Sequence, residues 1–270
     1  MGLLSNRIKR EDLEPGDHIY SWRFAYSYAH HGIYVGDGSV IHFTRGQGRE
    51  TGTGTCLDKI ITSSSSLSKA SASCTRGCDG DLGGNGVVQT CLECFLHGYP
   101  LYRFEYNENV FTFLAKTRGG MCSLAISDPS DIVLHRSQYL LANGFGDYHI
   151  FHNNCEDFAV YCKTGLLVLD SKHVGRSGQA VSFLGMPVAT ILSSPLRFFA
   201  AEVWSTLMIT TAMYCLSRYA ADVGVRKDVA KVPVEELVHI LRPLRATQQA
   251  DVEIDNVEES EVEQEACLAR

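Results

Sequence analysis

The sequence of 270 residues predicts an α+β protein in which an antiparallel sheet packs against helices. Two observations predict this class. Residues 28–35 and 39–43 have the composition of strands and flank the turn Gly36-Asp37-Gly38, as in a β-hairpin. Helical patterns follow later, over residues 130–143 and from Asn154 onward.

Four regions are predicted along the chain. A polar leader covers residues 1–13, and the main domain covers 14–168 with an insertion over 46–95. The insertion contains runs of glycine, threonine and serine, which are typical of loops. An apolar helical region covers 169–245, and a disordered acidic tail covers 246–270.

Further elements are expected within these regions. Strands are predicted at residues 18–22 and 101–106, and residues 87–95 are expected to be helical or irregular. The helix predicted over 130–143 ends at a glycine, which is a common helix terminator. Residues 232–244 have the pattern of a short amphipathic helix.

The negative charge of the chain is concentrated in its last segment. Eight of the 31 acidic residues lie between Asp251 and Glu265, and the rest of the chain has 23 acidic and 24 basic residues. A body with almost no net charge lacks the basic surface of a nucleic-acid-binding protein. Nucleic acid is therefore excluded as an expected partner.

The cellular compartment decides whether the cysteines are reduced or form disulfides. Residues 1–16 contain no apolar stretch of the kind that forms the core of a signal peptide. We therefore expect a cytoplasmic protein whose ten cysteines are reduced.

Two close pairs of cysteines lie in or beside the insertion, Cys74 with Cys78 and Cys91 with Cys94. Pairs at this spacing occur in structural zinc sites, and zinc could hold together a segment that lacks its own core. Unligated thiols are the alternative, and the spacing does not separate the two. A catalytic use is not expected, because none of the four is followed by a capped helix.

The region after residue 176 is strongly apolar. Residues 177–196 carry no charge but are interrupted by Pro187 and Pro195, and residues 203–217 are uncharged but short, so neither is expected to span a membrane. Residues 177–220 could instead attach the protein to a membrane surface. An ordinary buried helical layer is the alternative.

A candidate nucleophile lies at the start of the helix that follows Asn154. Asn154 is a good N-cap, and Asp157 stands where the acid of a capping box belongs. Cys155 would then lie in the first turn, where the N–H groups and the helix dipole favour a thiolate. Glu156 and Asp157 oppose this with negative charge, so the thiol still needs a base.

His30 and His42 are candidate bases, because they lie on the two strands of the hairpin. A two-residue turn at Asp37-Gly38 would point them to opposite faces. A three-residue loop, or an equivalent bulge, would put both on one face at a diagonal distance of roughly 7 Å. A shared role requires that second form, and His31 is expected to face the other way.

These residues also have structural interpretations. A cysteine at a helix start is usually a small buried hydrophobic residue, and a strand histidine is usually a satisfied polar group. The spacing alone therefore does not establish a Cys–His pair.

Three separated motifs carry more information together: Pro15-Gly16-Asp17, the hairpin from His30 to His42, and Asn154-Cys155-Glu156-Asp157-Phe158. Over residues 14–168 they closely resemble the lecithin:retinol acyltransferase (LRAT) family, whose members are relatives of NlpC/P60 thiol hydrolases. Within it, stretches such as Gly119-Gly120-Met121-Cys122 make the plant NC-domain, lead-sensitive-type proteins the most similar group. The resemblance implies a permuted papain-like fold, with the histidine before the cysteine and with an inserted cysteine-containing loop and a C-terminal helical extension added.

The resemblance also implies roles. Cys155 would be the nucleophile, His30 the general base, and His42 the group that orients or polarises His30. Cys155 would take the acyl group of a phospholipid or another acyl ester as a thioester, with no cofactor for catalysis. Backbone N–H groups at the helix start could hold the oxyanion. Hydrolases and acyltransferases share every step before the last acceptor, so these residues do not separate the two.

Two other functions fit the same residues. One is a catalytically silent scaffold or lipid-binding stress protein, against which the intact His30, His42 and Cys155 weigh. The other is an NlpC/P60-type peptidase, which no extracellular signal or wall-binding repeat favours. We therefore expect a thiol-dependent lipid acyltransferase or phospholipase A that acts at a membrane surface.

Overall fold

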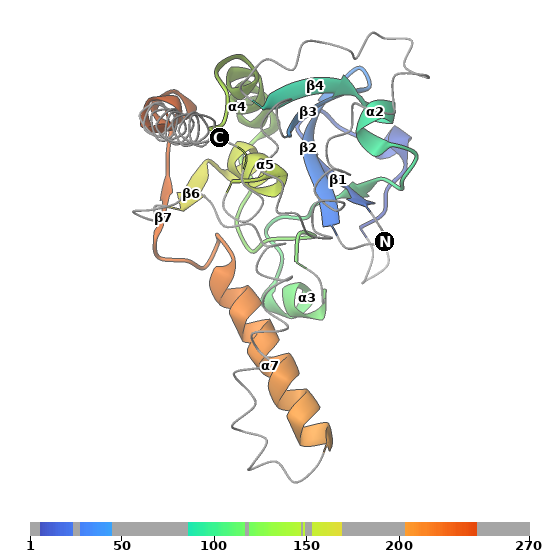
Figure 1. Cartoon of the computed structure of the whole chain (residues 1–270), viewed down its shortest axis with the longest axis vertical. Helices are drawn as coiled ribbons and strands as arrows, with labels where there is room; N and C mark the ends of the chain where they lie inside the picture. The colour runs from blue at the N-terminus through green and yellow to red at the C-terminus, as the bar shows by residue number, and fades with distance from the viewer. Residues whose placement is uncertain are drawn as a thin grey trace, which may run out of the picture.

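The computed structural model describes residues 6–23, 28–44, 86–116, 119–146, 148, 153–168 and 203–241. A five-stranded antiparallel sheet lies at its centre, with strand order β4-β3-β2-β1-β5 (Figure 1). The strands are β1 (His18–Arg23), β2 (Tyr28–Gly36), β3 (Ser39–Phe43), β4 (Val87–Cys91) and β5 (Tyr102–Arg103). Helices pack against this sheet, so the predicted α+β class is confirmed.

The remaining elements surround the sheet or follow it. They are η1 (Arg10–Asp12), α2 (Leu92–Leu96), α3 (Val110–Ala115), α4 (Ser130–Asn143), α5 (Cys155–Thr164), β6 (Leu166–Val168), α7 (Val203–Ala221) and β7 (Val229–Lys231). The helix predicted over 130–143 is confirmed as α4, with Gly144 at its C-cap. The strand predicted over 101–106 is shorter than expected, because only Tyr102 and Arg103 pair with β1.

The β2–β3 hairpin combines a tight turn with a bulge. Gly36 pairs with Ser39, which leaves Asp37 and Gly38 as a two-residue turn, and both have positive φ, at 50° and 66°. The register then shifts, so that Tyr34 pairs with Val40. Because of this shift, the side chains alternate between the two faces as they would in a hairpin with a three-residue loop. In that form His30 and His42 lie on the same face.

Residues 87–95 match their prediction only in part. The sequence predicts them to be helical or irregular, and residues 92–96 are helical as α2, but residues 87–91 form β4 and pair with β3 along its whole length. The N–H of Leu92 then donates to the carbonyl of Gly38 and fixes the start of α2 beside the hairpin turn. The end of the predicted insertion is therefore part of the central sheet.

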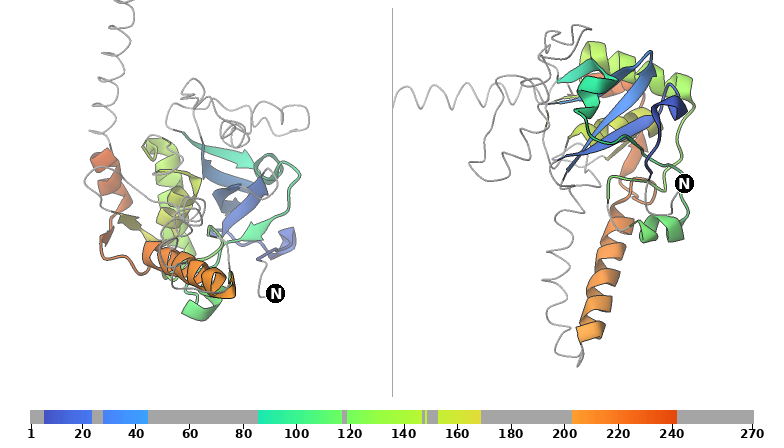
Figure 2. Two further views of the ribbon diagram at one scale, coloured as in Figure 1. Left: turned by 60° about the horizontal axis from the view of Figure 1, so that its bottom comes forward. Right: turned by 90° about the vertical axis from the view of Figure 1, so that its right-hand side faces the viewer.

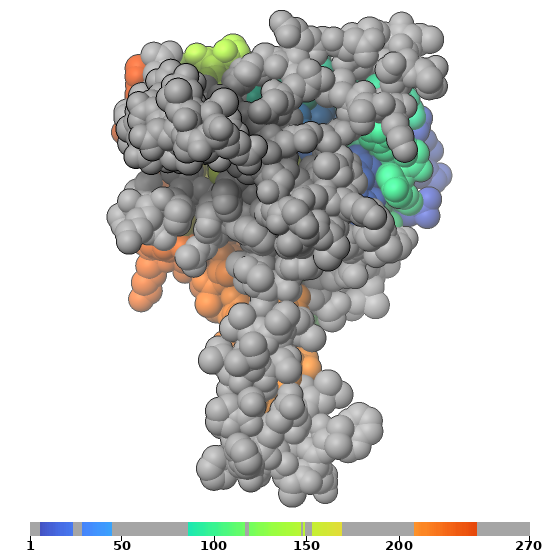
Figure 3. Space-filling model, in the orientation of Figure 1, coloured from blue at the N-terminus to red at the C-terminus, as the bar shows by residue number. Residues whose placement is uncertain are grey.

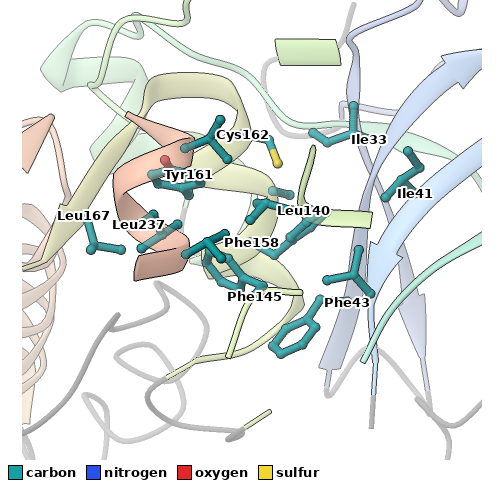
Figure 4. Close-up of a cluster of buried hydrophobic side chains, with 14 of the residues drawn as sticks. Ile33, Ile41, Phe43, Leu140, Phe145, Phe158, Tyr161, Cys162, Leu167 and Leu237 are labelled. Atoms are coloured by element: carbon teal, nitrogen blue, oxygen red, sulfur yellow. The ribbon is translucent and has the colours of Figure 1, made fainter. Parts of the chain in front are cut away.

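The two faces of the sheet are covered by different helices. On one face, Ile33, Ile41 and Phe43 pack against Phe158 and other side chains of α5 (Figure 4). On the other face, Val40 and Ile19 pack against α2, chiefly through Phe95. Side chains that alternate along each strand thus meet different helices on the two faces.

The last described residues, up to 241, pack against the sheet and α5. The β6–β7 pair joins the end of α5 to residues 229–231, and residues 234–241 are helical. Val232, Val234, Leu237, Val238 and Leu241 are buried in the same cluster as Phe158. These five side chains therefore share one hydrophobic cluster with the sheet and α5.

This packing predicts a difference between two neighbouring positions. Leu237 is fully buried in the core, whereas Ile240 is 38% exposed. Leu237→Ala is expected to lower the free energy of unfolding by about 2 to 5 kcal/mol, because it leaves a cavity. Ile240→Ala is the matched control and is expected to cost less than about 1 kcal/mol. Urea denaturation measures both, and equal small losses would show that residues 234–241 lie outside the core.

Helix α7 runs away from the sheet (Figure 2) and carries exposed apolar side chains. Met208 is 73% exposed and Leu216 is 67% exposed. Across the part of the chain that the structure describes, no helix is both long enough and apolar enough to cross a bilayer. Residues 177–202 and the acidic tail over 246–270 lie outside the described residues.

Candidate active site

The start of α5 has the predicted cap. The Asn154 side-chain oxygen accepts hydrogen bonds from the N–H groups of Glu156 and Asp157, at 2.9 and 3.3 Å. The Asp157 carboxylate accepts in return from the Asn154 N–H at 3.0 Å. The predicted capping box is therefore confirmed, and Cys155 is the first residue of the helix.

The cap predicts a measurable loss of stability. Asn154→Ala removes the acceptor of two buried or partly buried N–H groups and is expected to cost about 1 to 2 kcal/mol. Asn109→Ala is the control, since Asn109 caps α3 at an exposed position through one bond to Thr112. Chemical denaturation should show a smaller loss for Asn109→Ala, and the reverse order would contradict a structural role for the Asn154 cap.

The Cys155 thiol lies beside strand β2. Its Sγ is 3.8 Å from the carbonyl oxygen of Ala29, the residue before His30. The side chain is fully buried. A substrate carbonyl therefore reaches this sulfur only after the site opens.

His30 and His42 lie together, as the bulge requires. The Nε2 of His30 is 2.9 Å from the Nδ1 of His42, and the Nε2 of His42 is 3.0 Å from the Thr90 hydroxyl. Both rings are buried. The remaining ring nitrogen of His30, Nδ1, is buried and has no hydrogen-bond partner within the described part of the chain. This atom can accept a proton.

The surroundings keep both imidazoles neutral. Burial, followed by the nearby His42 and Arg23, holds the pKa of His30 well below its usual range. Burial, with Arg23, lowers the pKa of His42 to about 3. Arg23 is itself buried and donates to the carbonyls of Phe95 and Leu96 at the end of α2. Both histidines are thus unprotonated at neutral pH.

The body of α5 and the His30–His42 pair lie on opposite faces of the sheet. His30 and His42 pack against Phe95 of α2, with ring centroids 5.3 and 5.5 Å away. Phe158 of α5 packs on the Ile33 face. The Cys155 sulfur approaches the β2 backbone at Ala29, and neither ring nitrogen of His30 is hydrogen-bonded to it.

A second histidine chain lies on the α5 side of the sheet, and sequence reasoning missed it. His31 Nδ1 is 2.8 Å from His18 Nε2, and His18 Nδ1 is 2.8 Å from the Tyr106 hydroxyl. Burial lowers the pKa of His31 to about 3 and holds that of His18 well below its usual range. The strand register supplies the signal: His18 pairs with Ile33 and therefore points to the same face as His31.

Only two of the four cysteines predicted as zinc ligands lie within the described residues. Cys74 and Cys78 lie outside the described residues, and Cys91 and Cys94 lie at the junction of β4 and α2. In the described segments, no group of three or more histidine, cysteine or acidic side chains is arranged to hold a metal ion. The statement that none of these cysteines precedes a capped helix is wrong, since Cys91 is the N-cap of α2.

A small pocket of about 50 Å³ opens next to the start of α5. Its walls include Phe104, Phe113, Val160 and the two acids that follow Cys155. The end of α7 closes one side through Arg218 and Asp222. The described lining does not include Cys155, His30 or His42, so the pocket adjoins the candidate site without opening onto the sulfur.

Comparison with protein families identifies the class. The model of the lecithin retinol acyltransferase family matches residues 11–168, which are more than half of the chain. The chain therefore belongs to the LRAT family. Its motifs, from the Pro15 turn to the α5 cap, all lie within that span.

A particular relative is also found. The chain is 57% identical, over 241 residues, to Protein LEAD-SENSITIVE 1 of Arabidopsis thaliana, a match that covers 89% of this chain and 92% of that protein. This agrees with the predicted similarity to plant lead-sensitive-type proteins. No solved structure matches the chain.

Proposed function

We propose that the protein is a thiol-dependent lipid acyltransferase or phospholipase A that forms an acyl-thioester on Cys155. One observation carries the proposal: in an LRAT-family chain, the thiol that begins a capped helix lies beside β2, the strand that holds His30 of a buried histidine pair. A nucleophile needs a base near it and a third group that orients the base. His42 is hydrogen-bonded to His30 as such a third group would be, and the proposal requires Nδ1 of His30 to approach the thiol when the site opens.

The first half-reaction transfers the acyl group to the enzyme. The Cys155 thiol gives its proton to Nδ1 of His30, and Sγ attacks the ester carbonyl of a phospholipid. The tetrahedral intermediate collapses, and the lysolipid alkoxide leaves with the proton from His30. In the second half, water or another acceptor attacks the thioester, and His30 removes its proton. The second tetrahedral intermediate expels the Cys155 thiolate, which takes the proton back from His30.

His42 would hold His30 in position for this transfer. Its Nδ1 is hydrogen-bonded to Nε2 of His30, which leaves Nδ1 of His30 for the thiol. Thr90 fixes the other side of the His42 ring. Protonated His30 would share its Nε2 proton with His42, which offsets part of the cost of a buried charge.

The helix start offers the oxyanion fewer donors than expected. The N–H groups of Glu156 and Asp157 already donate to the Asn154 side chain. An oxyanion at Cys155 would therefore compete with the cap or use other donors once the site opens.

Two finer assignments belong to the same proposal. The fold would be a permuted papain-like one, supported by the order of a histidine-bearing sheet followed by a capped cysteine helix. The partner would be a membrane surface, reached from a cytoplasmic location through residues 177–220. The exposed Met208 and Leu216 on α7 support this contact.

The direct test is lipid turnover by the purified full-length protein. Vesicles of phosphatidylcholine labelled in the acyl chain are expected to release labelled fatty acid, and an added amine is expected to divert part of the label into an amide. The ratio of the two products separates hydrolase from transferase. Absence of turnover on phosphatidylcholine, phosphatidylethanolamine and phosphatidylglycerol would contradict the proposal.

A catalytically silent scaffold is the second candidate, and one observation favours it. Cys155, His30 and His42 are all buried, and the low pKa of His30 makes it a weak base in this enclosed state. A scaffold would keep the thiol enclosed when lipid is present. Labelling of Cys155 by a maleimide with and without vesicles distinguishes the two, since the proposed enzyme must expose the sulfur to lipid.

A further inference from the structure

The Cys91-Leu92-Glu93-Cys94 segment has a geometry that the proposed function does not use. Cys91 ends β4 and caps α2, and its sulfur accepts a hydrogen bond from the Cys94 N–H at 3.4 Å. Two cysteines three positions apart across the first turn of a helix lie within the Cα separation that a disulfide needs. Both side chains are partly exposed.

The segment is also held in place and open to reagents. The backbone of Cys91 pairs with Ser39, and the Leu92 N–H donates to the Gly38 carbonyl. Glu93 forms an exposed ion pair with Arg10 at 2.9 Å. Figure 3 shows this part of the chain at the surface, beside the N-terminal segment. A closely spaced pair of thiols at a fixed, accessible position is suited to reversible oxidation.

The residues next to both cysteines contact the histidine pair. Thr90, which precedes Cys91, is hydrogen-bonded to Nε2 of His42. Phe95, which follows Cys94, packs against the rings of both His30 and His42. A covalent bond across the first turn of α2 would therefore act on the two residues that position His42.

We propose that Cys91 and Cys94 form a redox-active dithiol whose oxidation to a disulfide changes the position of His42. The oxidant class is a peroxide. One thiol is oxidised by hydrogen peroxide to a sulfenic acid with release of one water, and the second thiol displaces a second water as the S–S bond forms. Two electrons and two protons pass from the dithiol to the peroxide. The effect of this change on acylation rests on the proposed function, whereas the disulfide itself does not.

The disulfide is tested by peptide mapping of the full-length protein. After peroxide treatment, remaining thiols are blocked with N-ethylmaleimide, and the protein is denatured and cut with trypsin and a glutamate-specific protease. Cleavage after Arg76, Glu93 and Arg103 separates Cys91 from Cys94. We expect residues 77–93 and 94–103 to remain joined, with the loss of two hydrogen atoms, until a reductant is added.

Matched variants identify the sulfurs. Residues 77–93 also contain Cys78, so the link is expected to persist in Cys78→Ser and to disappear in Cys91→Ser. Two separate peptides that both carry maleimide after peroxide would overturn the proposal. So would protection of all four cysteines that ends only when a chelator removes zinc, because this would make the segment half of a zinc site.

The coupling to His42 is tested by NMR of the imidazole ring, which does not depend on lipid turnover. The ring signals of His42 are expected to shift between reduced and oxidised protein, and to stay unchanged under peroxide in Cys91→Ser. His135, on α4 and exposed, is the internal control. An unchanged His42 signal in protein that contains the mapped disulfide would overturn the coupling.

Discussion

Replacing Cys155 with serine is expected to lower the rate of fatty-acid release from phosphatidylcholine by at least about a thousandfold, because it removes the proposed nucleophile of the covalent step. Cys215→Ser is the matched control. Cys215 lies on α7 and is partly exposed, so its replacement is expected to leave the rate unchanged. Turnover that survives in a folded Cys155→Ser protein would show that another group attacks the lipid.

The neighbours His30 and His31 sharpen this prediction, because both are buried and they face opposite sides of β2. His30→Ala is expected to lower the rate by about a hundredfold to ten-thousandfold, the usual contribution of a general base. His31→Ala is expected to lower it much less at equal stability. The reverse order would place the base on the α5 side, in the chain of His31, His18 and Tyr106.

Mild acid is expected to destabilise the fold by about 3 kcal/mol between pH 7 and pH 5.5. Burial lowers the pKa of four histidines: His18, His30, His31 and His42. A histidine with a lower pKa in the folded state binds fewer protons there than in the unfolded state. Its contribution to stability is therefore complete above about pH 6.5 and is lost as the pH falls.

One group opposes this trend strongly. Burial raises the pKa of Asp157 well above its usual range, so its protonation favours the folded state as the pH falls. Four histidines outweigh it, and the net slope keeps its sign. Urea denaturation at a series of pH values measures that slope. His135→Gln, at an exposed position on α4, should leave it nearly unchanged, and equal stability at pH 7 and 5.5 would contradict the buried histidine network.

Local features of the candidate site could be predicted from the sequence. The α5 cap depends on Asn154 and Asp157 at fixed spacing, and helix caps are determined by nearby residues. The hairpin likewise depends on Gly36, Asp37 and Gly38. The sequence did not show whether a three-residue loop or a bulge would place His30 and His42 on the same face. The structure has a two-residue turn with a bulge, which gives the same facing for His30 and His42.

Longer-range features could not be predicted in the same way. Residues 87–91 follow a glycine-rich stretch that is typical of a loop. Strand β4 is therefore recognised only from its pairing with β3 in the structure. Residues 229–241 join the core through contacts with α4 and α5 that no local pattern reveals. The sequence also did not determine which face of the sheet α5 covers. Strand periodicity places His30 and His31 on opposite faces, but it does not say which of the two lies on the α5 side.

The most direct test of the central claim is mass spectrometry of the full-length protein incubated with phosphatidylcholine. We predict an acyl adduct on the peptide that contains Cys155, removed by hydroxylamine as a thioester is, and absent from Cys155→Ser. The adduct is expected to form more slowly in His30→Ala and at the normal rate in Cys215→Ser. Lipid turnover without an adduct on Cys155, or an adduct on another cysteine that persists in Cys155→Ser, would contradict the claim.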